Sequence, residues 1–109
     1  VHDDDVRAAL QFIQENMHLP IQVGDILDRV PVSRRSLEMR FKRHVGATLH
    51  DYLRRVRIQH ACQLLVRTDR LIPDIARLCG FTDQRPFLDS FRREMGVAPT
   101  QYRKSRHRR

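Results

Sequence analysis

Arginine is the residue type in this chain with the most evident capacity for binding chemistry. Nineteen of the twenty-one basic residues are arginines, and the planar guanidinium can donate two hydrogen bonds at once to a phosphate or a guanine edge. The charge is uneven: residues 1–31 carry a net −4, and residues 32–109 carry a net +12. The sequence therefore predicts a polyanionic partner, contacted by residues after position 32.

The other reactive residue types do not form a site. His44 and His50 lie on either side of a predicted helix break, and His60 and Cys62 point in different directions because two residues turn a helix by about 200°. No pair has the spacing of a zinc site, and no serine, cysteine, histidine and acid are arranged for catalysis. We therefore predict no enzyme, no metal and no cofactor, and interpret Cys62 and Cys79 as small buried residues of a reducing compartment.

One pattern of apolar residues and turns occurs twice, about fifty residues apart. Each copy has a short helical segment, a tight turn, a hydroxyl residue, a longer helical segment and a glycine stop. The copies contain Asp25–Leu27, Val30–Ser33, Leu37, Phe41 and Gly46, and then Asp74–Ala76, Cys79–Thr82, Phe87 with Leu88, Phe91 and Gly96. An additional residue after the second turn changes the offset from forty-nine to fifty. A short helix, a turn and a second helix are typical of helix-turn-helix DNA readers, so the duplication predicts a protein that reads two stretches of duplex.

The elements that would position these residues are all helical. We expect seven helices, over residues 6–17, 23–29, 33–45, 48–68, 71–78 and 83–95, and a short one from 98 to 103. Ser33 and Thr48 are suitable N-caps, and Gly46 can take the left-handed conformation that ends a helix. The predicted fold class is all-α: a first helix-turn-helix subdomain at 1–47, a connecting helix at 48–68, a second subdomain at 69–103, and a disordered basic tail at 104–109.

The connecting helix is predicted to be a core element shared by both subdomains, because units of about fifty residues bury little surface alone. Its apolar residues form two stripes, one in each half. The first stripe is Leu49, Tyr52, Leu53 and Val56, and the second is Ile58, Ala61, Cys62 and Leu65. Each half would therefore dock one helix-turn-helix unit.

Both copies also carry a family resemblance over residues 6–103. The second copy has Ile75–Phe81, Phe87, Phe91–Arg93, Gly96, Pro99 and Tyr102–Arg103, and it resembles the C-terminal signature of the AraC/XylS family of bacterial transcription regulators. The first copy has Val32–Glu38, Arg40–Lys42, Gly46, Thr48 and His50. Within the family, it is most similar to the xylose-operon regulators.

The resemblance implies a function and a set of partners. Two recognition helices would enter adjacent major grooves on one face of double-stranded DNA, in a cytoplasmic activator that controls sugar (xylose-like) metabolism genes. The full-length protein would also contact RNA polymerase. Relatives of the xylose type have a sugar-sensing domain ahead of this one, so we expect an excised DNA-binding domain that is monomeric by itself.

The resemblance also assigns contact residues. Base contacts would come from the starts of the two recognition helices: Arg34, Arg35, Glu38 and Met39, and Gln84, Arg85, Leu88 and Asp89. Phosphate contacts would come from Ser33, Arg43, Thr48, Arg92 and Thr100. Pro86 departs from the family pattern, and we expect Asp83 to be the N-cap, which places Pro86 where its missing N–H is not needed. The direction in which the Gln84 and Arg85 side chains point is therefore left open.

Other interpretations of the charged residues stay open at this point. Arg34 and Arg35 could form a solvated helix face, Glu38 could pair with either of them, and Asp89 could pair with Arg85 or Arg93. Arg103 could bridge to an acid within the fold instead of reaching DNA. Two other functions also fit the charge: an architectural protein that coats DNA or RNA without sequence preference, and an arginine-rich helical module that docks an acidic protein.

Overall fold

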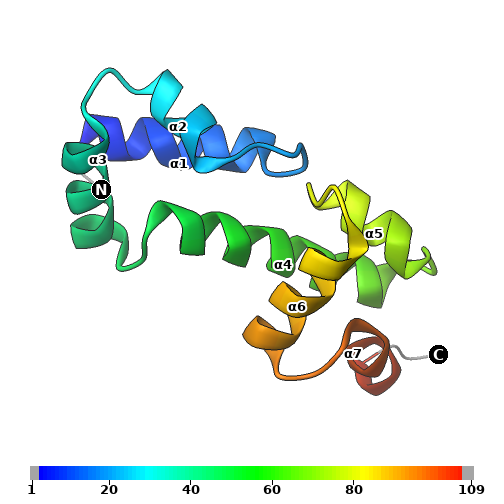
Figure 1. The fold of residues 1–109 in the computed structure, drawn as a ribbon. Helices are drawn as coiled ribbons and strands as arrows, with labels where there is room; N and C mark the ends of the chain where they lie inside the picture. Colours follow the sequence, from blue (N-terminus) through cyan, green and yellow to red (C-terminus); the bar gives the residue numbers. More distant parts are fainter. Residues whose placement is uncertain (1–2, 107–109) are drawn as a thin grey trace.

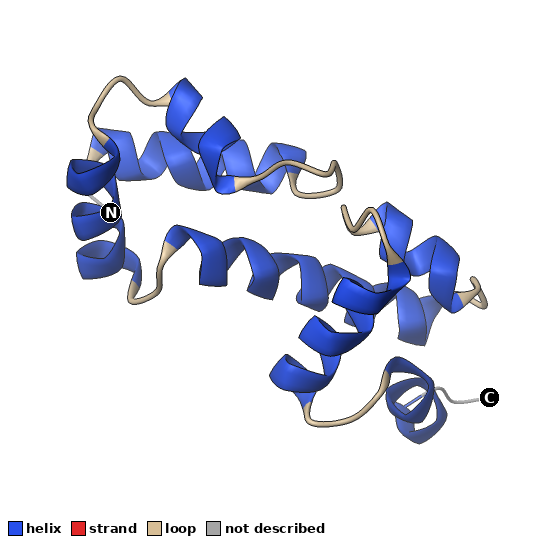
Figure 2. Cartoon of the chain, in the orientation of Figure 1, coloured by secondary structure: helices blue, strands red, loops and turns tan. Residues whose placement is uncertain are grey.

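The computed structural model describes residues 3–106 of the 109-residue chain, and these residues form seven helices and no strand (Figures 1 and 2). The helices are α1 (Asp4–Asn16), α2 (Val23–Arg29), α3 (Arg34–Val45), α4 (Leu49–Arg67), α5 (Ile72–Leu78), α6 (Gln84–Met95) and α7 (Pro99–Arg106). The predicted all-α fold is confirmed. Within residues 3–106, no helix has both the length and the apolar character needed to cross a membrane.

The molecule is elongated, with principal extents of 47 × 23 × 20 Å. Figure 1 shows α4 along the middle, with α1 to α3 at one end and α5 to α7 at the other. Two separate hydrophobic cores correspond to these ends. Leu37 and Phe41 of α3 lie in the first core, and Phe87 and Phe91 of α6 lie in the second. Each predicted recognition helix is therefore held by its buried face, and its opposite face is left at the surface.

Helix α4 contributes to both cores, as its two apolar stripes predicted. The buried residues of α4 up to Val56 belong to one core, and those from Ile58 onward belong to the other. Leu49, Leu53 and Val56 belong to the first core, with Tyr52 packed against it; Ile58, Ala61 and Leu65 belong to the second, with Cys62 packed against it. A single continuous helix therefore connects the two cores.

The helix ends follow the expected capping chemistry in the first subdomain and in α4. The Ser33 hydroxyl accepts from the Ser36 N–H at 3.2 Å, and the Thr48 hydroxyl accepts from the Asp51 N–H at 3.0 Å. Gly46 ends α3 at φ 86°, as predicted, and Gly96 ends α6 at φ 82°. Left-handed values of φ suit glycine because it has no Cβ.

Asp83 is the N-cap residue of α6, so Pro86 occupies the third helical position. The first three N–H groups of a helix have no partner within it, so proline removes no helical hydrogen bond there. The predicted cap is confirmed, although the Asp83 side chain makes no capping hydrogen bond. The start of α6 is therefore helical through Gln84 and Arg85.

Two boundaries differ from the sequence-based expectation by two residues or more. Helix α1 begins at Asp4 instead of Val6, because the Asp3 carboxylate caps it by accepting from the N–H groups of Asp5 and Val6. Helix α7 continues to Arg106, so the expectation of a disordered tail from residue 104 is wrong for residues 104–106. The Arg106 guanidinium lies 4.8 Å from the centre of the Tyr102 ring. Positions 107–109 of the expected tail lie outside the described residues.

Candidate nucleic-acid interface

The exposed face of α3 carries most of the residues assigned to the first half-site. Arg34 and Arg35 are exposed at its N-terminal turn, and Met39 is 55% exposed although it is apolar. Ser33 is exposed at the N-cap and Arg43 is exposed in the last turn. Leu37 and Phe41 point the other way into the core, so the same helical periodicity that buries them presents the polar residues outward.

The exposed face of α6 presents Gln84, Arg85, Asp89 and Arg92 in the same manner. Leu88 differs from them, because it is only partly exposed and packs against the second core. Part of its side chain is therefore occupied by the fold, and the thymine-methyl contact assigned to it has less apolar surface available than expected. Thr100, in the first turn of α7, is exposed.

Each of these two helices carries one arginine–carboxylate pair on its exposed face. Arg34 and Glu38 approach to 3.6 Å on α3, and Arg85 and Asp89 approach to 3.6 Å on α6. Both pairs are spaced by four residues, but the α3 pair starts at the first helical residue and the α6 pair at the second. One residue turns a helix by about 100°. Relative to the start of each helix, the two arginine–carboxylate pairs therefore point in different directions. Exposed pairs of this kind are weak and can separate when a base edge approaches.

A shallow groove of about 770 Å³ lies along the junction of α3 and α4. Its lining residues are Glu38, Met39, Lys42, Arg43, Thr48 and His50. Four of these were assigned to DNA from the sequence, two for bases and two for phosphates. The fold thus brings Thr48, at the N-terminus of α4, beside the outer face of α3.

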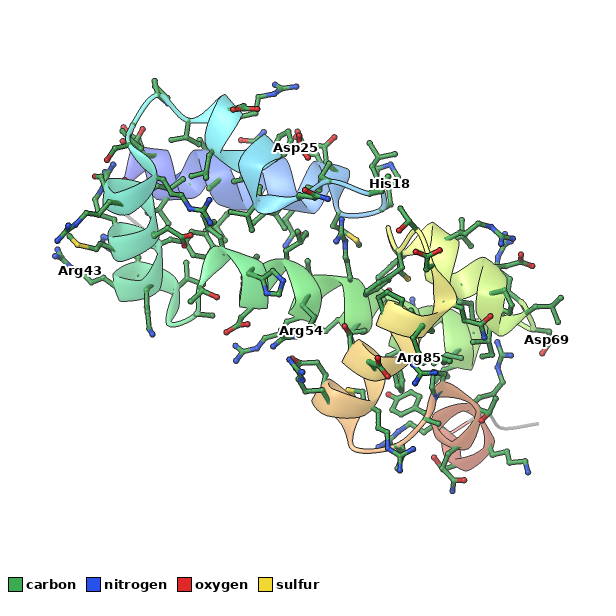
Figure 3. All side chains as sticks on the ribbon, in the orientation of Figure 1. His18, Asp25, Arg43, Arg54, Asp69 and Arg85 are labelled. Atoms are coloured by element: carbon green, nitrogen blue, oxygen red, sulfur yellow. The ribbon has the colours of Figure 1, made fainter. Side chains whose placement is uncertain are left out.

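A second groove of about 670 Å³ lies between the two subdomains. It is lined from α3 by Arg34 and Glu38, from α4 by His50, Leu53, Arg54 and Arg57, and from α6 by Pro86 and Ser90, together with residues 21–24 and Phe81. Figure 3 shows Arg43 on the outer side of α3, Arg85 on α6 and Arg54 on α4 between those two helices. The arginines that line this groove therefore come from α3 and α4, whereas α6 contributes the uncharged residues Pro86 and Ser90.

His50 and Lys42 border these grooves but were not assigned to DNA from the sequence. His50 has an exposed side chain on the first turn of α4, and it lines both grooves. The repeat offset of fifty pairs His50 with Thr100, which was assigned to a phosphate. The same offset pairs Lys42 with Arg92, which was also assigned to a phosphate, so it was a signal that could have identified both His50 and Lys42.

Several charged side chains are used inside the fold. Arg103 donates to the carbonyl oxygens of Leu65 and Thr68 at 3.0 and 3.1 Å. It therefore binds backbone at the end of α4 within the fold, and its partner there is not an acid. Arg54 pairs with Asp51 at 3.2 Å. Desolvation raises the pKa of Asp51, but the Arg54 charge and the Thr48 hydrogen bond outweigh it and lower the pKa overall.

The described residues offer no metal centre. Within residues 3–106, no group of three or more His, Cys, Asp or Glu side chains is placed to hold a metal ion. Cys62 and Cys79 are both free thiols. Burial raises the pKa of Cys79 to about 12 and also raises the pKa of Cys62, so both thiols stay protonated near neutral pH and are poor nucleophiles.

Comparison with known proteins agrees with the geometry. Residues 26–105 match a family model described as a helix-turn-helix domain. The lactose operon transcription activator of Staphylococcus xylosus is 34% identical over 101 residues, covering 93% of this chain and 36% of that protein. The xylose operon regulatory protein of Escherichia coli is 33% identical over 101 residues, covering 93% of this chain and 26% of that protein. This chain thus spans about a quarter to a third of the curated relatives it matches.

Solved structures show the same arrangement of helices. The C-terminal domain of AraT, a response regulator from Geobacillus stearothermophilus, has a TM-score of 0.94 and 30% identity, covering 98% of this chain and 89% of that one. The DNA-binding domain of the global transcriptional factor AdpA, in complex with a target DNA, has a TM-score of 0.88 and 27% identity, covering 94% and 93%. The chain therefore belongs to the family of AraC-type helix-turn-helix domains, which bind specific DNA sequences in transcription regulators and are not enzymes.

Proposed function

We propose that this domain reads two half-sites of one operator, with α3 and α6 in successive major grooves on the same face of the duplex. The observation that carries the proposal is the attachment of both helix-turn-helix units to opposite halves of one helix, α4. A domain that needed only one recognition helix would gain nothing from an equivalent exposed face on the second. Both faces carry arginines at the second helical position, Arg35 and Arg85.

The dimensions of the domain support this proposal. Helix α4 has 19 residues, which at ~1.5 Å each span roughly 28 Å. Major grooves on one face of DNA recur every ~34–36 Å. The longest extent of the molecule, 47 Å, leaves room for a recognition helix beyond each end of that span.

We assign base contacts to the exposed N-terminal parts of α3 and α6. Arginine can donate two hydrogen bonds to guanine, glutamine can pair with adenine, and a carboxylate can accept from cytosine. The proposed base-contacting residues are Arg34, Arg35, Glu38, Met39, Gln84, Arg85, Leu88 and Asp89, and the proposed phosphate-contacting residues are Ser33, Arg43, Thr48, Arg92 and Thr100. Leu88 is the weakest member of the first group because it also packs against the second core.

For the whole protein we propose a regulator of sugar-metabolism genes that acts in the cytoplasm, where chromosomal DNA is accessible, and contacts RNA polymerase. Two relatives, a lactose operon transcription activator and a xylose operon regulatory protein, support the assignment to sugar-metabolism genes. We propose that the domain alone is a monomer, because one copy already presents two recognition helices.

A change in half-site spacing tests the two-groove proposal. A preferred duplex would first be selected from a randomised pool, and then five base pairs would be inserted between its half-sites. The insertion is about half a helical turn, so the second half-site faces away, and we expect most of the specific affinity to be lost. Substituting the central base pairs without changing their number is the control and should matter much less, apart from effects on DNA bending. Equal affinity for the normal and lengthened duplexes would show that only one unit engages DNA.

A further inference from the structure

The two subdomains also touch outside α4, at the turn between α5 and α6. Gly80 lies in this turn with φ 87°, and a Cβ there would lie 2.4 Å from the carbonyl oxygen of Met17 and 2.7 Å from that of Leu19. Met17 and Leu19 belong to the loop that follows α1, in the other subdomain. Figure 1 shows this loop ending beside the chain between α5 and α6. The backbones of the two subdomains are therefore in direct contact, at a separation that only glycine permits.

Arg57 of α4 joins the same loop to the second subdomain. Its Nε donates to the Met17 carbonyl at 2.9 Å, and one terminal nitrogen donates to the carbonyls of Leu19 and Ile21 at 2.7 and 2.9 Å. The guanidinium carbon lies 5.9 Å from the centre of the Phe81 ring. The Met17 carbonyl at the end of α1 has no partner within that helix, so one side chain binds it together with two loop carbonyls and also contacts the residue after Gly80.

A second bridge lies along α4 from this contact. Arg54 donates from Nε to the Glu94 carboxylate of α6 at 3.1 Å, and both side chains are largely buried, with 15% and 21% exposure. Arg54 stands beside Leu53, a residue of the first core, whereas Glu94 lies on the helix that forms the second. The orientation of α6 is therefore fixed against the first half of α4 as well as against its own core.

We propose that Arg57 and Gly80 form a rigid joint that sets the position of α6 relative to α3, and that they are positioning residues for operator spacing. The inference deepens the proposed two-groove binding and rests on it. A helix with one subdomain on each half can still bend or twist, and each core could follow its own half. The joint removes that freedom because three carbonyls are held by one planar group and the turn cannot shift toward them without overlap.

Rigid coupling has a measurable consequence for binding. When one unit has bound, the second binds at an effective concentration that is high only if the geometry already matches the duplex. One inserted base pair moves the second half-site by about 3.4 Å and turns it by roughly 34°. A rigid domain should reject that duplex strongly, whereas a domain with a loosened joint should tolerate it.

The experiment compares variants with matched controls. Gly80→Ala introduces a Cβ into the joint, and Gly96→Ala is its control because φ is similarly positive, at 82°, with nothing within 4 Å of the added Cβ. Arg57→Lys keeps the charge but loses the fork that reaches three carbonyls. Arg55→Ala, at an exposed neighbouring arginine of α4, controls for any substitution on this helix. Affinities are measured for a single half-site, the normal duplex and the duplex with one inserted pair, with thermal unfolding to verify folding.

We expect Gly80→Ala and Arg57→Lys to bind a single half-site within about twofold of the unchanged domain, and to bind the normal duplex about tenfold more weakly. Their preference for the normal over the lengthened duplex should fall by at least the same factor. The controls Gly96→Ala and Arg55→Ala should keep the preference. Retention of the full preference by folded Gly80→Ala and Arg57→Lys would overturn the role of the joint in operator spacing.

A second measurement, without DNA, separates this inference from the proposed function. NMR relaxation and residual dipolar couplings report whether the two subdomains tumble as one body. We expect one body for the unchanged domain and greater relative motion of the subdomains for Arg57→Lys, which supports the joint whatever the DNA result. Unchanged relative orientation and tumbling of the subdomains in Arg57→Lys and Gly80→Ala would refute the joint. Equal affinity of the unchanged domain for one and two half-sites would instead refute two-groove binding.

Discussion

Phe91 and Tyr102 pack edge to face, with ring centroids 5.5 Å apart and ring planes inclined by 80°. Phe41 and Tyr52 make the same contact in the first subdomain, at 5.6 Å and 73°. Both pairs are separated by eleven residues, and the offset between them is fifty. The structural repeat therefore continues past the glycine stop, so that α7 corresponds to the first turns of α4.

The separation of the two cores predicts which helices a core substitution destabilises. Phe91→Ala removes a fully buried ring from the second core and should lower the free energy of unfolding by about 3–5 kcal/mol. Because the first core contains none of the second core's residues, hydrogen exchange should increase mainly in α5 to α7. Phe91→Leu retains most of the side-chain volume and should cost less. A uniform increase in exchange over α1 to α3 would contradict the separation of the cores.

Binding to duplex DNA should depend steeply on salt. The basic excess after residue 32 is +12, and neutralising six to ten phosphates lowers affinity by ~10³–10⁵ between about 50 and 200 mM salt. Titrations at several salt concentrations with selected and random duplexes provide the slope and the preference. A flat slope, or equal affinity for both duplexes, would argue against a sequence reader.

Substitution of the two equivalent recognition-helix arginines should change specificity. Arg35→Ala and Arg85→Ala should each cost about 1–3 kcal/mol on the preferred site and relax the preference at one or two base pairs. The matched control is Arg70→Ala, an exposed arginine between α4 and α5, which should weaken all sequences slightly and equally. Selection from a randomised duplex pool measures the preference. The assignment fails if both recognition-helix variants select the same sequence as the unchanged domain.

Stability should decrease in acid through Asp3. Desolvation raises the pKa of Asp3, but the Val6 N–H and the Arg40 guanidinium outweigh it and lower the pKa overall. A carboxyl with a lowered pKa in the folded state stabilises the fold above its unfolded value of about 4 and loses this contribution as pH falls through the folded value. Asp3→Asn retains a capping side chain and should lower the unfolding temperature at neutral pH.

The effect of Asp3→Asn should shrink as the pH falls below about 4, because Asp3 of the unchanged domain then becomes neutral as well. Arg40, at 2.9 Å, and His44, at 3.9 Å, are the basic groups that face this carboxylate. Thermal unfolding as a function of pH measures the difference, with Asp4→Asn, an exposed neighbour, as the control. A difference that is independent of pH would show that the charge of Asp3 does not stabilise the fold.

The sequence by itself determined the helices and their assignment to two units. Periodic apolar residues, hydroxyl caps at Ser33 and Thr48 and the stop at Gly46 are local signals, and they act within a few residues of the structure they specify. The two apolar stripes of α4 could be predicted for the same reason, since residues three or four apart share a face of a helix. The exposed residues at the start of α3 and α6 follow from the same periodicity.

Only the tertiary structure decided which charged residues bind within the fold. Arg40 to Asp3, Arg57 to Met17 and Arg103 to Leu65 join residues 37 to 40 positions apart. Two of these arginines bind backbone carbonyls, which every residue possesses, so no residue type in the sequence marks the acceptor. The close approach at Gly80 is of the same kind, because the backbone that crowds it belongs to the other subdomain. Contacts of this kind depend on how α4 places the two units, and that placement exists only once both cores have formed.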